Sequence, residues 1–214
     1  MMTNKVILYS FFRSSASWRV RIALAFKEIK YEYRAVNLFQ DGGQQNSEEY
    51  KRVNPMGQVP ALIIDGHTLT QSVSIIEYLE ERNPDPPLLP KDKYGRAQVR
   101  ALSEIINSGI QPYQNLSVLD KVGKGKDEWA KSFIEKGYHG LETFLKQTSG
   151  KYSYGNTVTM ADLFLVPQMF AAKRYKVNME QFPTISQVYD SLIVLPAFKA
   201  ADAVNQPDMP PNFQ

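Results

Sequence analysis

The sequence contains no cysteine. This absence excludes disulfide bonds, thiolate metal sites and a catalytic cysteine in this chain. Histidine is almost as scarce, because only His67 and His139 occur, and they are far apart in the sequence without the spacing of metal ligands. We therefore expect no metal centre and no chemistry that depends on a thiol of the protein itself.

Long apolar runs and a strong excess of one charge are also absent. The N-terminus lacks the apolar stretch of a signal peptide, and no segment approaches the ~20 apolar residues that a membrane span needs. The 214 residues include 25 Lys and Arg against 22 Asp and Glu, which gives a formal net charge of +3. Neither half of the chain is strongly basic. We therefore expect a cytoplasmic protein that binds neither membranes nor nucleic acid.

Several common catalytic and nucleotide-binding motifs are missing as well. The sequence has no Gly-x-Ser-x-Gly, which marks the nucleophile turn of many hydrolases, and no Walker loop. Its segment Gly123-Lys124-Gly125 lacks the third glycine of a dinucleotide-binding fingerprint. These motifs therefore give no support for a serine hydrolase, a nucleotide hydrolase or a dehydrogenase.

The first 84 residues have the pattern of a compact α/β unit. Residues 5–9 (Lys-Val-Ile-Leu-Tyr) predict a short buried strand, and from Ala16 the apolar residues recur with the period of a helix. Further strands are predicted at 31–36, 61–64 and 67–70, with a hairpin turn at 65–66 and helices near 47–52 and after Ser72. In the last helix we expect Glu80 to face water with the neighbouring charged residues. This order of elements predicts a mixed sheet covered by helices.

A proline-rich segment separates this unit from a helical one. Residues 83–92 include four prolines and cannot form the interior of a helix or sheet. Helices are predicted from 92 towards 122 with an interruption near Pro112, through 129–145, from a capping box of Thr159 with Asp162, and near 185–195 and 197–203. We therefore expect domains at 1–84 and 92–214 joined by a linker at 85–91, with a loosely ordered tail from 207 to 214.

Polar residues at two predicted helix starts are suited to binding anions. Ser14 and Ser15 lie where the first strand leads into a helix, and Gln71 with Ser72 opens another helix. A helix start offers free backbone N–H groups and a positive dipole end. Val59 and Pro60 precede a strand, and their exposed backbone groups could pair with an extended peptide. The X-Pro bond between them can be cis. This combination favours a small, extended peptide acid as a ligand.

Several stretches resemble the zeta-class glutathione transferases, known also as maleylacetoacetate isomerases. In the first half these are the Ser-Ser-x-Ser-Trp-Arg-Val-Arg stretch at 14–21 and the segments 41–45, 54–60 and 71–72. In the second half, 109–117, 159–162 and 206–208 continue the resemblance, which spans essentially the whole chain. The resemblance implies an α/β thioredoxin-like N-terminal domain followed by an all-α C-terminal domain, the glutathione transferase fold, in a homodimer.

The resemblance also implies a set of functional residues. Glutathione is the expected cofactor, and Ser14, Ser15 and Arg174 are the expected catalytic residues, with Arg174 facing the carboxylate of a small anionic electrophile. Arg13 and Arg19 are further candidates to contribute to this recognition, and either could be structural. The residues expected to bind glutathione are Ser14, Ser15, Gln45, Val59, Gln71, Ser72, Gln111 and Asn115. One position departs from the family pattern, since Ala16 stands where the motif ordinarily has cysteine.

The expected reaction is the glutathione-dependent cis–trans isomerisation of maleylacetoacetate to fumarylacetoacetate in tyrosine and phenylalanine catabolism, with glutathione transferase activity. One alternative keeps the same site but conjugates glutathione to electrophiles or removes halide from small α-halo acids. A second alternative is a glutathione-binding module whose chemistry has lapsed, for which Ala16 is a weak argument and the presence of Ser14, Gln71 and Ser72 a counter-argument. A thiol-transferase mechanism through an enzyme–glutathione disulfide is excluded because the chain has no cysteine.

Overall fold

The computed structural model describes residues 5–212, which form two compact units. The first unit contains residues up to Pro86 together with the C-terminal segment from Pro196, and the second runs from Pro87 to Leu195. Within the described residues, no helix has both the length and the apolar character needed to cross a membrane.

A four-stranded mixed sheet forms the centre of the first unit. The strands β1 (Ile7–Ser10), β2 (Glu32–Ala35), β3 (Ala61–Ile64) and β4 (His67–Thr70) are arranged in the order β2-β1-β3-β4. Strand β1 pairs parallel with β2 and antiparallel with β3, and β3 and β4 form an antiparallel hairpin. The mixed sheet predicted from the order of elements is confirmed.

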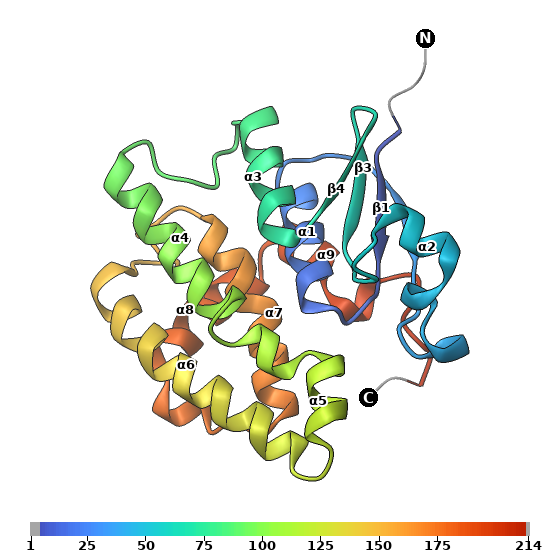
Figure 1. Ribbon diagram of the computed structural model, residues 1–214. Coiled ribbons are helices and arrows are strands. Elements are labelled where there is room, and N and C mark those ends of the chain that lie inside the picture. Colours follow the sequence, from blue (N-terminus) through green and yellow to red (C-terminus); the bar gives the residue numbers. More distant parts are fainter. Residues whose placement is uncertain (1–4, 213–214) are drawn as a thin grey trace. The chain divides into compact units, whose positions relative to one another are not determined.

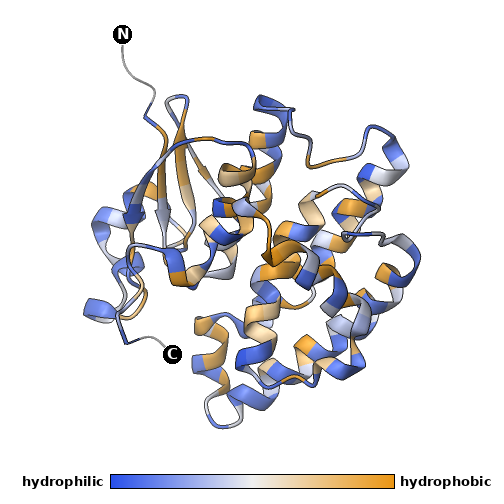
Figure 2. Ribbon diagram, turned by 180° about the vertical axis from the view of Figure 1, so that it is seen from behind, coloured by the Kyte–Doolittle hydropathy of each residue, from blue (hydrophilic) through white to orange (hydrophobic). Residues whose placement is uncertain are grey.

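Helices cover both faces of this sheet. In Figure 1, α1 (Ser15–Phe26) and α3 (Ser72–Arg82) lie side by side on one face, and α2 (Glu48–Val53) lies on the other. The short 3₁₀ helices η1 (Gln40–Gly42) and η2 (Gln44–Asn46) lead into α2. Leu8, Leu62 and Ile76 are fully buried, and Figure 2 shows the central strands as mainly apolar. Burial of both sheet faces explains why β1 and β3 read as continuous apolar runs.

One expectation about α3 is wrong. Glu80 was expected to face water, but it is buried and accepts a hydrogen bond from Lys27 Nζ at 2.8 Å. Lys27, which follows α1, also donates to the carbonyl oxygens of Asn83 and Pro86 at 2.6 and 3.0 Å. A buried lysine with three acceptors explains why a charged residue of α3 turns inwards.

The second unit is helical. It consists of α4 (Lys93–Asn107), η3 (Gln111–Gln114), α5 (Leu116–Val122), α6 (Lys126–Thr148), α7 (Met160–Arg174), η4 (Met179–Gln181) and α8 (Pro183–Ile193). Helix α7 packs against α4 and α8, and its residues Met160–Met169 are all buried. The capping box predicted at its start is confirmed, because Thr159 N–H donates to Asp162 Oδ2 at 2.7 Å. Asp162 also accepts from Ser153 N–H and so has the structural role expected of it.

The helix expected from residue 92 towards 122 is interrupted as predicted, over residues 108–115. Pro112 lies inside η3, and the Asn115 side chain caps α5 by accepting from Ser117 N–H at 3.1 Å. Gly109 also matters here, since an added Cβ would lie 2.6 Å from the carbonyl oxygen of Ile105. The break is therefore encoded by a proline, a capping residue and a close backbone approach.

The C-terminal segment returns to the first unit. Its helices α9 (Pro196–Ala201) and η5 (Ala203–Asn205) belong there, and α9 packs against α1. This grouping differs from the expectation that residues 92–214 form one helical domain, and the predicted domain boundaries stay a prediction. The tail was expected to be loose, but Asp208 is hydrogen-bonded to Phe12 N–H at 3.0 Å. Residues 213–214 lie outside the described part of the chain.

Candidate functional site

The register of the sheet brings three predicted site segments to one edge. Ala61, the first residue of β3, pairs with Tyr9 near the end of β1 and with Thr70 at the end of β4. The segments that leave or enter the sheet at this edge therefore lie close together. They are the β1–α1 loop that leads to Ser14 and Ser15, the Val59–Pro60 segment before β3, and the Gln71–Ser72 turn after β4.

Ser14 occupies the N-terminus of α1 in a form suited to anion binding. Its side-chain oxygen accepts from Ser17 N–H at 3.2 Å and so caps the helix. No described residue accepts the Ser14 hydroxyl proton, which is therefore available to a ligand. Ser14, Ser15 and Ala16 are half-buried, whereas Ser17 is buried. The accessible end of α1 thus combines a hydroxyl donor with the positive end of a helix dipole.

Val59 offers its backbone at the same edge. The Val59–Pro60 bond is cis, as the sequence allowed. The loop before it is held by Tyr50 Oη and Asn54 Nδ2, which donate to the carbonyl oxygen of Gln58 at 2.7 and 2.6 Å. No described residue forms a hydrogen bond with the Val59 N–H or C=O. An extended peptide can therefore pair with this residue in the manner of an added strand.

Gln71 and Ser72 form a second helix start. Gln71 has φ 67° and ψ 118°, an unfavourable backbone conformation for a residue with a Cβ, and its side chain is exposed. Strained backbone of this kind is concentrated at functional sites. Ser72 is buried at 6% exposure, and its Oγ accepts from Arg19 Nη1 of α1 at 3.2 Å. The start of α3 is therefore tied to α1 by a buried cation.

Gln45 lies beside the Val59 loop. Its carbonyl oxygen would be 3.0 Å from a Cβ added to Gly57, and its side-chain amide would be 2.5 Å from a Cβ added to Gly43. Gly43, with φ +93°, thus supplies both the turn and the space that the Gln45 amide occupies. Gln45 Oε1 is buried without a hydrogen-bond partner among the described residues. This orphaned acceptor is what a site built for a ligand's N–H group would contain.

Three of the predicted residues belong to the second unit. Gln111 lies in η3, and Asn115 is four residues further on, where its Oδ1 accepts from both Ser117 N–H and Ser117 Oγ. The Asn115 Nδ2 donors are therefore the part of this side chain that could contact a ligand. Arg174 is the exposed last residue of α7, with its guanidinium carbon 5.4 Å from the centre of the Tyr175 ring.

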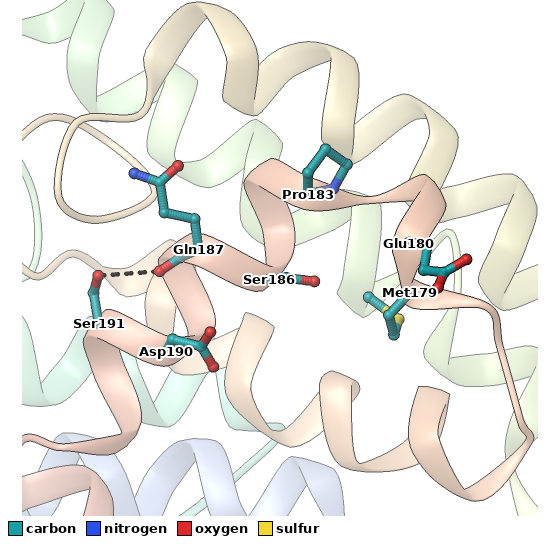
Figure 3. Close-up of a pocket in the computed structure, with 7 residues that line it drawn as sticks. All are labelled: Met179, Glu180, Pro183, Ser186, Gln187, Asp190 and Ser191. Atoms are coloured by element: carbon teal, nitrogen blue, oxygen red, sulfur yellow. Dashed lines mark hydrogen bonds between the residues drawn. The ribbon is translucent and has the colours of Figure 1, made fainter.

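The depression that contains Arg174 is not lined by Gln111 or Asn115. Arg174 lines a depression with Asp127, Glu128 and Lys131 of α6. A second, open pocket of about 770 Å³ lies along η4 and α8 and contains none of the predicted residues (Figure 3). In that pocket the Ser191 hydroxyl donates to the Gln187 carbonyl oxygen at 3.0 Å. The described residues contain no group of three or more His, Asp or Glu side chains that could hold a metal ion.

Sequence reasoning missed a buried polar network next to Ser14. Arg21 is fully buried on α1 and donates to the carbonyl oxygens of Phe11 and Phe12 at 3.2 and 2.7 Å. Burial lowers the pKa of Arg21, and the same effect, together with a hydrogen bond to Asp208, raises the pKa of Tyr33. The only sign of this network in the sequence was Arg21 itself, a charged residue between the apolar Val20 and Ile22.

Comparisons with known proteins agree with this fold. Residues 4–81 match the family model of the glutathione S-transferase N-terminal domain, and residues 113–200 match that of the glutathione S-transferase C-terminal domain. The chain belongs to the glutathione S-transferase family. Its fold is the thioredoxin-like domain with a helical domain that the resemblance implied.

Within this family the chain is similar to the maleylacetoacetate isomerases of the zeta class. It is 53% identical to the maleylacetoacetate isomerase of Rattus norvegicus, over 98% of both chains. The maleylacetoacetate isomerase of Anaeromyxobacter dehalogenans, solved with bound GSH, is 45% identical over 98% of this chain and 100% of that one, with a TM-score of 0.89. The same enzyme has also been solved with bound dicarboxyethyl glutathione and citrate. That structure is 44% identical over 99% of this chain and 97% of that one, with a TM-score of 0.88.

A third match makes the class explicit. The holo structure of maleyl pyruvate isomerase, a bacterial glutathione S-transferase in the zeta class, is 38% identical over 95% of this chain and 100% of that one, with a TM-score of 0.92. The family expected from the 14–21 stretch and from the segments in the second half is therefore confirmed.

Proposed function

We propose that this protein is a glutathione-dependent isomerase that converts maleylacetoacetate to fumarylacetoacetate and also has glutathione transferase activity. The observation that carries the proposal is the Ser14 hydroxyl at the accessible N-terminus of α1, in a chain similar to maleylacetoacetate isomerases over nearly its full length. The reaction would serve the breakdown of tyrosine and phenylalanine.

The residues of the first unit fit glutathione as a ligand. Glutathione is an extended peptide with a thiol and two carboxylates. The unpartnered backbone of Val59 suits its peptide groups, and the N-terminus of α3 at Gln71 and Ser72 suits the γ-glutamyl carboxylate. The orphaned Oε1 of Gln45 suits a donor group of the ligand. Gln111 and Asn115 are included among the glutathione-binding residues on the basis of the family resemblance alone.

Ser14 would hold the ligand's sulfur as an anion. An ordinary thiol has a pKa of about 8.5, so lowering it by two units needs about 2.7 kcal/mol of preferential stabilisation of the thiolate. A helix N-terminus supplies about 0.3–1 kcal/mol, and up to about 2 when partly buried. A hydroxyl donor to an anion adds about 1.5–3 kcal/mol. Ser14 and the start of α1 can therefore suffice without a cysteine at position 16.

Bound glutathione supplies a thiolate that adds reversibly to the activated carbon–carbon double bond, which makes that bond temporarily single and free to rotate. Ser14 stabilises the sulfur before addition and after elimination. Ser15 lies in the first turn of α1, where its backbone N–H adds to the positive end of the helix. Arg174 would bind a carboxylate of the substrate through paired N–H donors.

The assembly and location of the protein belong to the same proposal. We infer a homodimer in the cytoplasm, on the basis of the family resemblance. Sedimentation of the purified protein at several concentrations tests the dimer. A monomer that is fully active at all concentrations would contradict it.

The decisive experiment measures the conversion of maleylacetoacetate by purified protein with and without glutathione. We expect fumarylacetoacetate to form only when glutathione is present, and glutathione to be regenerated rather than consumed. A rate measured in parallel with an α-halo acid tests the dehalogenation alternative. Retention on glutathione resin without turnover of any electrophile would favour a binding module and contradict the proposal.

A further inference from the structure

We propose that Asp208 and Arg21 are positioning residues that fix the β1–α1 loop and thereby aim the Ser14 hydroxyl at the ligand's sulfur. The C-terminal segment would thus be part of the machinery that activates glutathione. This inference rests on the proposed function and deepens it, because it adds residues from α1 and from the opposite end of the chain to the activation of the thiol.

The C-terminal segment holds the loop through one carboxylate. Asp208 Oδ2 accepts from Phe12 N–H at 3.0 Å, although the two residues are 196 positions apart in the sequence. Asp208 Oδ1 accepts from Tyr33 Oη of β2 at 2.6 Å. Both carboxylate oxygens are therefore used, and the side chain is fixed between the sheet and the loop two residues before Ser14.

Arg21 holds the same loop from the side of the helix. Its Nη2 donates to the Phe12 carbonyl oxygen at 2.7 Å, and its Nη1 donates to the Phe11 carbonyl oxygen at 3.2 Å and to Ser10 Oγ at 3.1 Å. Its Nε donates to the Ala201 carbonyl oxygen of α9 at 3.0 Å. One buried guanidinium thus joins the end of β1, the loop and the C-terminal segment.

These contacts leave the loop little freedom just before Ser14. The Phe11 carbonyl oxygen accepts from Ser14 N–H at 3.0 Å, so the loop turns directly into the capping serine. The network therefore holds the Phe12 N–H and the carbonyl oxygens of Phe11 and Phe12. A hydroxyl that stabilises a thiolate must be placed within about 0.5 Å of its working position. A network that fixes three backbone groups next to it meets this requirement.

The buried cation of Arg21 and the half-buried carboxylate of Asp208 stabilise one another. Full burial of Arg21 disfavours its cation and lowers its pKa, whereas Asp208 and Asp202 oppose this shift. Tyr33 and Tyr31 also face Arg21, and burial raises the pKa of each, so both remain neutral hydroxyls at physiological pH. The loss of the Asp208 carboxylate would leave Phe12 N–H and Tyr33 Oη without their acceptor and would weaken the hold on the loop.

The test compares Asp208→Ala and Asp208→Asn with the control Asp202→Asn. Asp202 lies in the same segment and also acts on Arg21 through its charge, but its carboxylate accepts a hydrogen bond from Val204 N–H, at 3.2 Å, and not from the β1–α1 loop. For each protein the pKa of the bound glutathione thiol is measured from the ultraviolet absorbance of the thiolate. The kcat and the KM for glutathione are measured in the isomerase assay, or with a general electrophile.

We expect Asp208→Ala to raise the pKa of the bound thiol by about one unit and to lower kcat about tenfold at pH 7, with a KM within about threefold of wild type. Asp208→Asn should recover part of both effects, because its amide oxygen can still accept from Phe12 N–H. Asp202→Asn should match wild type. If Asp208→Ala does not fold, Tyr33→Phe takes its place, since it removes one of the two bonds to Asp208 and should shift the thiol pKa in the same direction.

Two other results have distinct meanings. Variants that lose thermal stability while the thiol pKa and the kcat per active site stay at the wild-type values would overturn the positioning role and leave the proposed function intact. A wild-type protein that neither binds glutathione nor turns over any electrophile would overturn both.

Discussion

At the scale of single residues, we propose that Ser72 binds glutathione without taking part in the chemistry. It lies at the start of α3, where its Oγ accepts a hydrogen bond from the buried Arg19, whereas Ser14, which would stabilise the sulfur, lies at the start of α1. We expect Ser72→Ala to raise the KM for glutathione and to leave kcat nearly unchanged, which is the signature of uniform binding. Initial rates over a range of glutathione concentrations measure both constants. Loss of rate at saturating glutathione would assign Ser72 a direct part in catalysis.

Position 16 is the second residue-scale test. Ala16 is half-buried in the first turn of α1, next to the serines that would hold the thiolate. Ala16→Cys should raise isomerase turnover about fivefold, since a thiol could restore one weak contact worth about 1 kcal/mol. Turnover of a halo acid should rise less. A thiol at a helix start is also prone to modification, so mass spectrometry should detect adducts after exposure to substrate.

The matched control for this experiment is wild-type protein with alanine at position 16. If Ala16→Cys changes the two activities in the same ratio and carries no adduct, the position has only a packing role.

At the scale of helices, a buried ion pair connects the C-terminal end of α1 with α3. The side chain of Lys27 is fully buried and that of Glu80 is 8% exposed, and Lys27 also holds two carbonyl oxygens after α3. Removing one partner of a buried pair leaves an uncompensated charge. We expect Lys27→Met to lower the free energy of unfolding by about 3–5 kcal/mol, measured by urea denaturation.

An exposed pair provides the control for this prediction. Lys131 and Glu135 lie one turn apart on α6 at 3.8 Å, with side chains about one-third exposed. Lys131→Met should change the free energy of unfolding by less than about 1 kcal/mol. Equal effects of Lys27→Met and Lys131→Met would show that burial of the Lys27 pair has no energetic consequence.

The helices and strands were largely predictable because their signals are local. The capping serine of α1, the Asp65-Gly66 turn and the capping box of α7 each lie within four residues of sequence, and each forms as expected. The burial of Glu80 was not predictable, because its partner Lys27 is 53 residues away. Polarity alone places a glutamate at the surface, and only the packed structure supplies the cation that changes this.

In the candidate site, too, the residues with a local sequence signal were predictable and those that depend on distant contacts were not. Ser14 and Ser72 were identified at helix starts, which are visible in the sequence, and Gln45, Gln111 and Asn115 only through the family resemblance. The strained backbone of Gln71 had no local signal, since glutamine does not favour a positive φ. The network of Arg21 and Asp208 joins segments almost 200 residues apart, and such contacts follow only from the folded chain.

At the scale of the whole molecule, glutathione binding should be coupled to stability. A ligand that binds only the folded state raises the free energy of unfolding by about 2.7 kcal/mol when its concentration is 100 times its Kd. We expect urea denaturation of wild-type protein to show this increase with glutathione. Ser72→Ala should need a higher glutathione concentration for the same increase. Stability that does not change at any glutathione concentration would contradict a glutathione site in the folded protein.

The central claim is that the start of α1, through Ser14, turns the thiol of glutathione into a thiolate. A titration of the thiol of bound glutathione by ultraviolet absorbance, in wild type and in Ser14→Ala, tests this claim most directly. We predict that the wild-type complex titrates about two units below the free thiol value of about 8.5, and that Ser14→Ala moves the pKa back towards that value and lowers the rate about 10- to 100-fold. A bound thiol with the pKa of free glutathione in wild type, or the same lowered pKa in Ser14→Ala, would contradict the claim.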